Sequence, residues 1–266
     1  MKTRRRTSSS PVLGTLAVVA TLFVVAPLVS VVIRVPWGDF WSTLTSNAVR
    51  QSLFISLQTS LVAAVLAAFL GIPLSWWLSR TSHKFSRVIR TVCIAPMVLP
   101  PVVAGIALLA AFGRRGVVGE QLFNWWGISL PFTKTAVVLA QVFVAMPFLI
   151  LAVEAAFRQV DEGLEDAART LGASPLRIFF TVVVPSVRPA LLAGLVLAWA
   201  RSFGEFGASI TFAGSFPGRT QTLPMSVYEI ATYDYRQALV VSVFMMFISV
   251  GVLATMRDRW ATGAPR

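Results

Sequence analysis

The chain has 266 residues, of which 56% are hydrophobic and only 13% charged, with a formal net charge of +12 and a mean hydropathy of +0.75. Soluble chains carry about 45–50% apolar and about 25% charged residues, so this composition excludes a disordered chain and argues against a soluble globular enzyme. Apolar runs of about twenty residues predict an all-α polytopic membrane protein, because β-barrel strands show only ~10-residue alternating segments.

Six apolar runs are long enough to cross the ~30 Å hydrocarbon core as helices. These predicted spans are 12–33, 53–78, 91–112, 136–157, 189–206 and 238–256. The apolar stretch of the first is longer than the 7–15 residues typical of a signal peptide, and no clear cleavage site follows, so we expect it to stay in the membrane. Three spans carry polar residues that predict contact with protein or water rather than lipid: Gln58, Gln141, Glu154, Arg201 and Glu205.

Lys and Arg residues are distributed unevenly between the two sides of these spans. Fifteen belong to the amino terminus, the connections after the second and fourth spans, and the carboxyl tail, against seven in the other three connections. The basic side is expected to be cytoplasmic, which puts both termini inside. The predicted parts are a basic amino terminus 1–11, a first helix with its outer loop 12–50, a transmembrane domain 51–256 and a cytoplasmic tail 257–266. The positive charge then reflects topology, and we expect no binding of nucleic acid.

Motifs for catalysis, metal binding and nucleotide binding are missing from the sequence. A single cysteine, Cys93, excludes an intrachain disulfide and a cysteine-based metal cluster, and a single histidine, His83, argues against a zinc or haem site. The sequence contains no GxSxG, HExxH or GxxxxGK[ST] pattern. We therefore expect no catalytic residue, no metal and no cofactor, and we expect ATP to bind elsewhere.

The cytoplasmic connection 158–188 has the pattern of two short helices joined by a sharp bend. Apolar residues recur at helical spacing from Val160 to Leu171, acidic residues crowd the start, and Gly172 is placed to end the helix. Ser174-Pro175 supplies an N-cap and a first-turn proline for a second helix. An amphipathic helix lying on the membrane surface and a docking element for a partner both fit this pattern.

The spacing within the loop favours docking. Asp166-Ala167-Ala168-x3-Gly172-x9-Val182-x-Val184-Pro185 resembles the EAA loop of ABC-importer permeases, with Asp, Val and Val in place of the usual Glu, Ile and Leu. In that family the loop docks into a groove on a separate ATPase subunit. The resemblance implies an ATPase-coupling site made of Asp166, Ala167, Ala168 and Gly172, with Glu165 as an adjacent contact.

The fifth span carries two opposite charges. Arg201 and Glu205 are four residues apart, so on one helix they would share a face and pair. Each charge costs ~2.5–3.5 kcal/mol at the centre of a span, so the pair needs a partner or water. Small residues that admit a neighbouring helix surround the pair: Gly204, Gly207, Ala208 and Gly214. A structural ion pair and a pathway or gate element remain the two interpretations.

The segments 200–229 and 95–105 are similar to the permeases of molybdate transporters, and sulfate permeases share part of this similarity. Gly204-Glu-Phe-Gly207 is of the shared type, whereas Pro217-Gly-Arg-Thr-Gln-Thr-Leu-Pro224 is more like the molybdate permeases. In the third span, Pro100-Pro101 removes two backbone donors and should bend or interrupt the helix. Either a structural kink or a mobile, pore-lining helix would result.

The resemblance implies a type I ABC-importer permease that moves molybdate, or alternatively tungstate, by alternating access. It further implies a homodimer in a bacterial or archaeal plasma membrane, two ATPase subunits inside and a molybdate-binding protein outside. A sulfate or thiosulfate permease is the alternative within the family. An ion-coupled secondary transporter would favour inverted repeats, which are not evident in the sequence. A membrane scaffold without transport is the third alternative.

Overall fold

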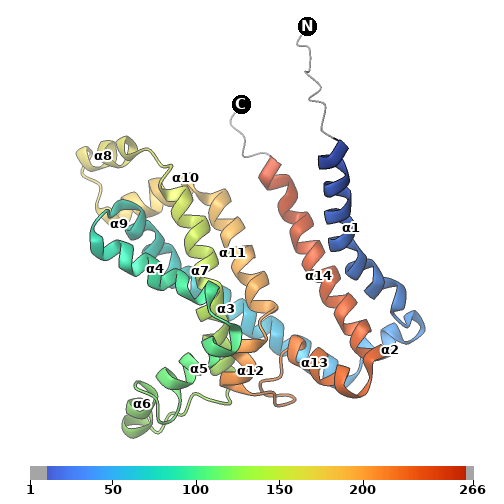
Figure 1. Ribbon diagram of the computed structural model, residues 1–266. Helices are drawn as coiled ribbons and strands as arrows, with labels where there is room; N and C mark the ends of the chain where they lie inside the picture. Colours follow the sequence, from blue (N-terminus) through green and yellow to red (C-terminus); the bar gives the residue numbers. More distant parts are fainter. Residues whose placement is uncertain (1–10, 262–266) are drawn as a thin grey trace.

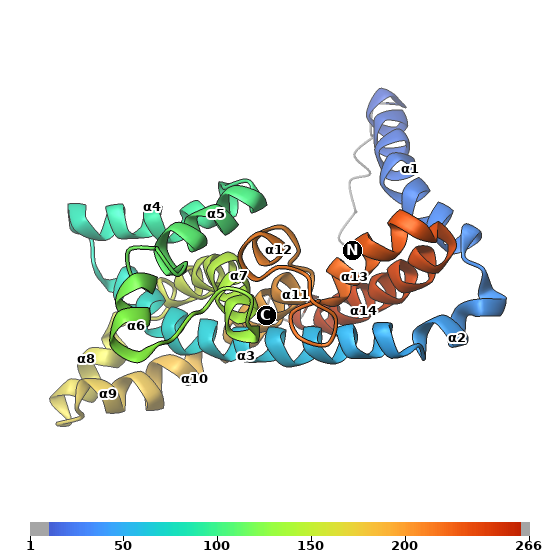
Figure 2. The same cartoon turned by 90° about the horizontal axis from the view of Figure 1, so that it is seen from below.

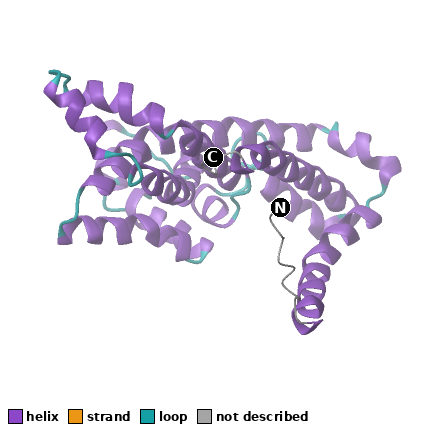
Figure 3. Cartoon of the chain, turned by 90° about the horizontal axis from the view of Figure 1, so that it is seen from above, coloured by secondary structure: helices purple, strands orange, loops and turns teal. Residues whose placement is uncertain are grey.

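The computed structural model describes residues 11–261 and is helical throughout, without a β-strand in that range (Figures 1 and 3). Residues 1–10 of the predicted basic amino terminus and 262–266 of the predicted tail lie outside the described residues. The helices are α1 (Pro11–Arg34), η1 (Trp37–Asp39), α2 (Phe40–Leu44), α3 (Asn47–Arg80), α4 (Lys84–Val98), α5 (Pro101–Phe112), α6 (Gly119–Trp126), α7 (Lys134–Phe157), α8 (Glu162–Thr170), α9 (Pro175–Ile178), η2 (Phe179–Val183), α10 (Val184–Ser186), α11 (Arg188–Phe203), α12 (Gly207–Ala213), α13 (Leu223–Tyr233) and α14 (Tyr235–Ala261).

Four helices in the described range are long and apolar enough to cross a membrane: α1, α3, α7 and the first eighteen residues of α14. A fifth crossing results if the bent pair Pro175–Ser186 and Arg188–Phe203, which meet at 81°, is taken as one span. Six unbroken spans, as predicted from the sequence, are therefore not confirmed.

Two helices, α4 and α5, together cover the predicted third span, 91–112. α4 ends at Val98 and α5 begins at Pro101, with Leu99 and Pro100 in extended conformation between them. The interruption expected from the two prolines is confirmed, because a residue before proline avoids helical angles and proline itself offers no N–H. The 12 residues of α5 rise only about 18 Å, less than the hydrocarbon core of a bilayer.

The predicted fifth span, 189–206, also ends early. α11 stops at Phe203, and the chain starts a new helix, α12, at Gly207. Glu205 therefore lies in a break between two helices rather than on the face of one.

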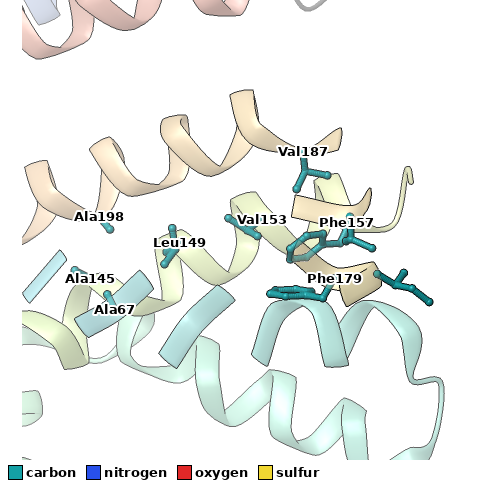
Figure 4. Close-up of a cluster of buried hydrophobic side chains, with 10 residues drawn as sticks. Ala67, Ala145, Leu149, Val153, Phe157, Phe179, Val187 and Ala198 are labelled. Atoms are coloured by element: carbon teal, nitrogen blue, oxygen red, sulfur yellow. The ribbon is translucent and has the colours of Figure 1, made fainter. Parts of the chain in front are cut away.

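The core forms where α3, α7 and α11 pack together (Figure 4). Small residues allow this close approach: a Cβ on Gly194 of α11 would come within 3.1 Å of the Leu149 side chain on α7, and one on Gly71 of α3 within 3.2 Å of the same residue. The buried cluster joins these helices to the segment after α8: Ala67, Ala145, Leu149, Val153, Phe157, Ile178, Phe179, Val183, Val187 and Ala198.

α1 stands apart from this core and lies beside α14 (Figures 1 and 2). Val31 and Val32 near its end pack on Leu239, Val240 and Val243 of α14, whereas none of the helix's membrane-scale window is buried. An apolar helix exposed on nearly all sides is suited to contact with lipid or with another subunit.

The helix ends fall into two groups at opposite ends of the molecule (Figure 1). The start of α1, the end of α14 and the loop that carries α8 lie toward the upper end in Figure 1, with α8 well apart from α1, whereas α6, α12 and α13 lie toward the lower end. This arrangement agrees with the grouping of the basic connections on one side.

Candidate coupling and translocation sites

The loop after α7 forms the two helices and the bend that its sequence predicts. Asp161 begins α8 by accepting a hydrogen bond from the Gly163 amide at 2.9 Å. Gly172 follows the helix with φ +80, a conformation that L side chains rarely adopt. The Ser174 hydroxyl then accepts a hydrogen bond from the Arg177 amide at 3.4 Å and caps α9.

The predicted coupling residues lie on different faces of this loop. Asp166, Ala167 and Gly172 are exposed, and Ala168 is partly buried. Glu165, predicted as an adjacent partner contact, is instead only 3% exposed and turned into the molecule. Two residues of the predicted apolar face, Leu164 and Leu171, are exposed (51% and 87%). α8 thus presents apolar and small residues outward at its exposed turn.

A buried ion pair fixes α8 to the end of α3. Arg80 donates to the Glu165 carboxylate through Nε at 3.0 Å and also through Nη2. Arg169 lies 3.7 Å from the other carboxylate oxygen. Since removing one partner of a buried pair leaves an unpaired charge, Arg80 and Glu165 are expected to hold the exposed face of α8 in one orientation.

A second buried carboxylate ties α4 to α7. Glu154 Oε1 accepts from Arg90 of α4 at 2.8 Å and from Arg158 at 2.8 Å, and Arg90 also donates to the Leu78 carbonyl at 3.1 Å. Sequence reasoning flagged Glu154 as a polar residue in a span but missed its partners. A charge inside a span predicts that a partner exists, but the sequence pattern does not show that the partner is Arg90 of the preceding connection.

The predicted Arg201–Glu205 pair forms across the break between α11 and α12. Arg201 Nη1 lies 2.6 Å from Glu205 Oε2, and Glu205 Oε1 accepts from the Ala208 amide at 2.8 Å. The Glu205 side chain is 1% exposed, whereas that of Arg201 is 29% exposed. The pairing is confirmed, but the shared helix face is wrong: Glu205 reaches Arg201 from the break while accepting a hydrogen bond from the first turn of α12.

The two helix breaks meet at Pro101 and Gly207. A Cβ on Gly207 would clash with the Pro101 side chain, and one on Gly105 of α5 would come within 2.5 Å of Thr211 and 2.9 Å of the Ala208 carbonyl. By contrast, a Cβ on Gly204 would meet only the Ala200 carbonyl at 3.6 Å. Gly207 therefore allows the close helix packing predicted for this segment, and Gly204 is not needed for it.

α4 connects the region of the Arg90–Glu154 pair to the contact between Pro101 and Gly207. It pairs with α7 through Arg90 and Glu154, and at Val98 it ends just before the Pro100–Pro101 break that contacts α12. The described residues contain no group of three or more His, Cys, Asp or Glu side chains able to hold a metal.

Residues 69–262 match the family described as the inner membrane component of binding-protein-dependent transport systems. The chain belongs to this family of ABC-importer permeases.

The chain is similar to individual permeases of molybdenum and sulfate transport systems. The chain is 40% identical to the molybdenum transport system permease protein ModB of Mycobacterium tuberculosis over 247 residues, 93% of each chain. It is 32% identical to a probable sulfate transport system permease of Chlorokybus atmophyticus, over 81% of this chain and 75% of that protein. Among solved structures, a bacterial alginate ABC transporter in complex with a pentasaccharide-bound periplasmic protein superposes with a TM-score of 0.72. The superposition covers 94% of this chain and 91% of that chain at 14% identity, a similarity of fold.

Proposed function

We propose that this chain is the membrane-spanning subunit of an ATP-driven importer that carries molybdate, or tungstate as an alternative oxyanion, into the cytoplasm. The observation that carries the proposal is the 40% identity, over 93% of both chains, to a molybdenum transport permease. The sulfate relative is less similar and leaves more of its own length unmatched, which favours molybdate over sulfate or thiosulfate.

In the proposed assembly two copies of the chain form a homodimer in a bacterial or archaeal inner membrane, with both termini cytoplasmic. Two ATPase subunits dock on α8 through Asp166, Ala167, Ala168 and Gly172, and hydrolyse the ATP. The exposure of Leu164 and Leu171 supports docking, because apolar side chains open to solvent are suited to a protein contact. A molybdate-binding protein delivers the anion at the opposite face.

The proposed mechanism is alternating access. Closure of the ATPases moves α8, and the Arg80–Glu165 and Arg90–Glu154 pairs pass the movement to α3, α4 and α7. α4 then displaces the Pro101–Gly207 contact, at which the breaks containing Pro100 and Glu205 meet. We assign the Arg201–Glu205 pair and these breaks to the pathway or gate.

The test is reconstitution of the chain with its ATPase and binding protein in liposomes. We expect the ATPase to copurify with the chain, and molybdate uptake to require ATP inside and to persist when ion gradients are collapsed. Uptake that needs an ion gradient but no ATP would assign a secondary transporter. A chain that binds the ATPase without supporting uptake would be a scaffold.

A further inference from the structure

Four arginines line a hollow of about 430 Å³ where α3, α4 and α7 meet at the end of the molecule that carries α8. Arg80 ends α3, Arg87 and Arg90 lie on α4, and Arg158 follows α7. Serine and threonine residues of the α3–α4 connection complete the wall, with Glu162 as its single acidic lining residue.

The side chains around this hollow carry more positive than negative charge. Arg90 and Arg158 share one carboxylate, that of Glu154, and the side chain of Arg87 forms no hydrogen bond or ion pair within the described part of the chain. Glu162 does not cancel the surplus, because its side chain is 77% exposed and lies 3.5 Å from Arg80, which is already paired with Glu165. Glu154 also fixes the two guanidinium groups in place, each with its Nη1 group unused.

An exposed apolar stripe runs along α4, the helix that also carries Arg87 and Arg90 of the hollow. Phe85, Val88 and Val92 recur at helical spacing on α4 and are 59–69% exposed, and Lys84 and Arg87 lie beside them in the sequence. A helix with basic residues next to exposed apolar residues is typical of the boundary between lipid headgroups and acyl chains. A free oxyanion would use the arginines alone, whereas a phospholipid would use both surfaces.

We propose that this hollow binds the phosphate group of an anionic phospholipid, with the acyl chains covering Phe85, Val88 and Val92. The proposal rests on the topology proposed above, which makes this end cytoplasmic, where basic pockets between helices are suited to anionic headgroups. Guanidinium groups bind phosphate oxygens through paired N–H donors. The bound lipid neutralises the surplus charge beside the Arg80–Glu165 and Arg90–Glu154 pairs.

The test is lipid retention by the intact transporter in native mass spectrometry, after equilibration with equal amounts of phosphatidylglycerol and phosphatidylcholine. We expect preferential retention of phosphatidylglycerol, reduced about fivefold in Arg87→Ala, since one basic side chain near an anionic surface contributes that order of affinity. Arg115→Ala is the matched control, because Arg115 is also exposed and unpaired within the described residues but lies beyond α5, at the other end.

A second arm adds millimolar inorganic phosphate, first to the lipid-free transporter and then to the transporter loaded with phosphatidylglycerol. Phosphate that binds the wild type but not Arg87→Ala, and displaces phosphatidylglycerol, would keep the oxyanion site and change its source to a free anion. Equal retention of both lipids together with no phosphate binding, or equal losses in Arg87→Ala and Arg115→Ala, would overturn the site. Neither arm uses ATP or molybdate, so failure here is separate from failure of the proposed transport function.

Discussion

The carboxylate of Glu205 receives two donors, the Arg201 guanidinium at 2.6 Å and the Ala208 amide at 2.8 Å, while its side chain is 1% exposed. Removing either charge alone leaves the other without its partner, and breaking a buried pair costs about 3–5 kcal/mol. Removing both charges removes that penalty together with the pair. The two kinds of variant therefore separate the stability of the segment from its role in transport.

We predict that Glu205→Leu lowers the amount of folded protein in the membrane more than Arg201→Leu combined with Glu205→Leu does. If the pair belongs to the gate, as proposed, the double variant assembles with its ATPase yet transports poorly or leaks. Membrane abundance, ATPase copurification and molybdate uptake are measured on the same variants. Wild-type uptake in all of them would leave these charges without either role.

Single residues show how far the sequence determines the site. The four-residue spacing of Arg201 and Glu205 was enough to predict their contact, because the backbone stays turned from Ala200 to Glu205 and keeps the two residues close. The burial of Glu165 could not be predicted in the same way, because its partner Arg80 lies 85 residues earlier in the chain. Which face of α8 turns inward is decided by that tertiary contact, and the apolar pattern of the helix alone pointed the other way.

At the scale of elements, Gly172 controls where α8 ends. Its φ of +80 is costly for most side chains, whereas a Cβ there would meet nothing within 4 Å. A substitution at Gly172 is therefore limited by backbone strain rather than by crowding. Left-handed backbone costs an ordinary L residue roughly 1–2 kcal/mol, whereas asparagine tolerates it.

We predict that Gly172→Val weakens ATPase association or uncouples ATP hydrolysis from uptake, while the protein still reaches the membrane. Gly172→Asn is the matched control and should retain most of the coupling. The measurement is the number of molybdate ions imported per ATP hydrolysed, together with ATPase copurification. Normal coupling in Gly172→Val would instead favour a plain interfacial helix.

The contact between α5 and α12 leads to a second prediction about an element. Gly207→Ala places a methyl group against Pro101, and an overpacked contact of this kind costs about 1–3 kcal/mol. We expect Gly207→Ala to reduce uptake or thermal stability. Gly204→Ala, three residues earlier, should behave as the wild type, because its Cβ would make only an ordinary contact with the Ala200 carbonyl. Equal behaviour of the two variants in uptake and thermal unfolding would contradict the close packing of these helices.

The two helix breaks differ in how predictable they are. The break before α5 follows from Pro100-Pro101, since the restriction acts through the local backbone. The break at 204–206 contains no proline. It depends on two contacts: the Glu205 carboxylate accepts a hydrogen bond from the Ala208 amide, and Gly207 packs against Pro101. Neither contact can be predicted from hydropathy. Hydropathy therefore located both segments, the prolines predicted the break in the first, and the break in the second was not predicted.

At the scale of the whole molecule, the basic residues predict the orientation. The asymmetry of fifteen against seven predicts that the α8 end faces the cytoplasm. We predict that a reporter fused after Ser174 signals a cytoplasmic position and one fused after Arg219 an external position. The same signal from both fusions would refute this topology.

The central claim is that the assembled transporter carries a tetrahedral oxyanion of the molybdate class. The most direct measurement is uptake of labelled molybdate by the reconstituted transporter, with unlabelled tungstate or sulfate as competitor. We predict that tungstate blocks uptake at low concentration and that sulfate does so only in large excess. Equal competition by sulfate would contradict the assignment and place the chain with the sulfate permeases.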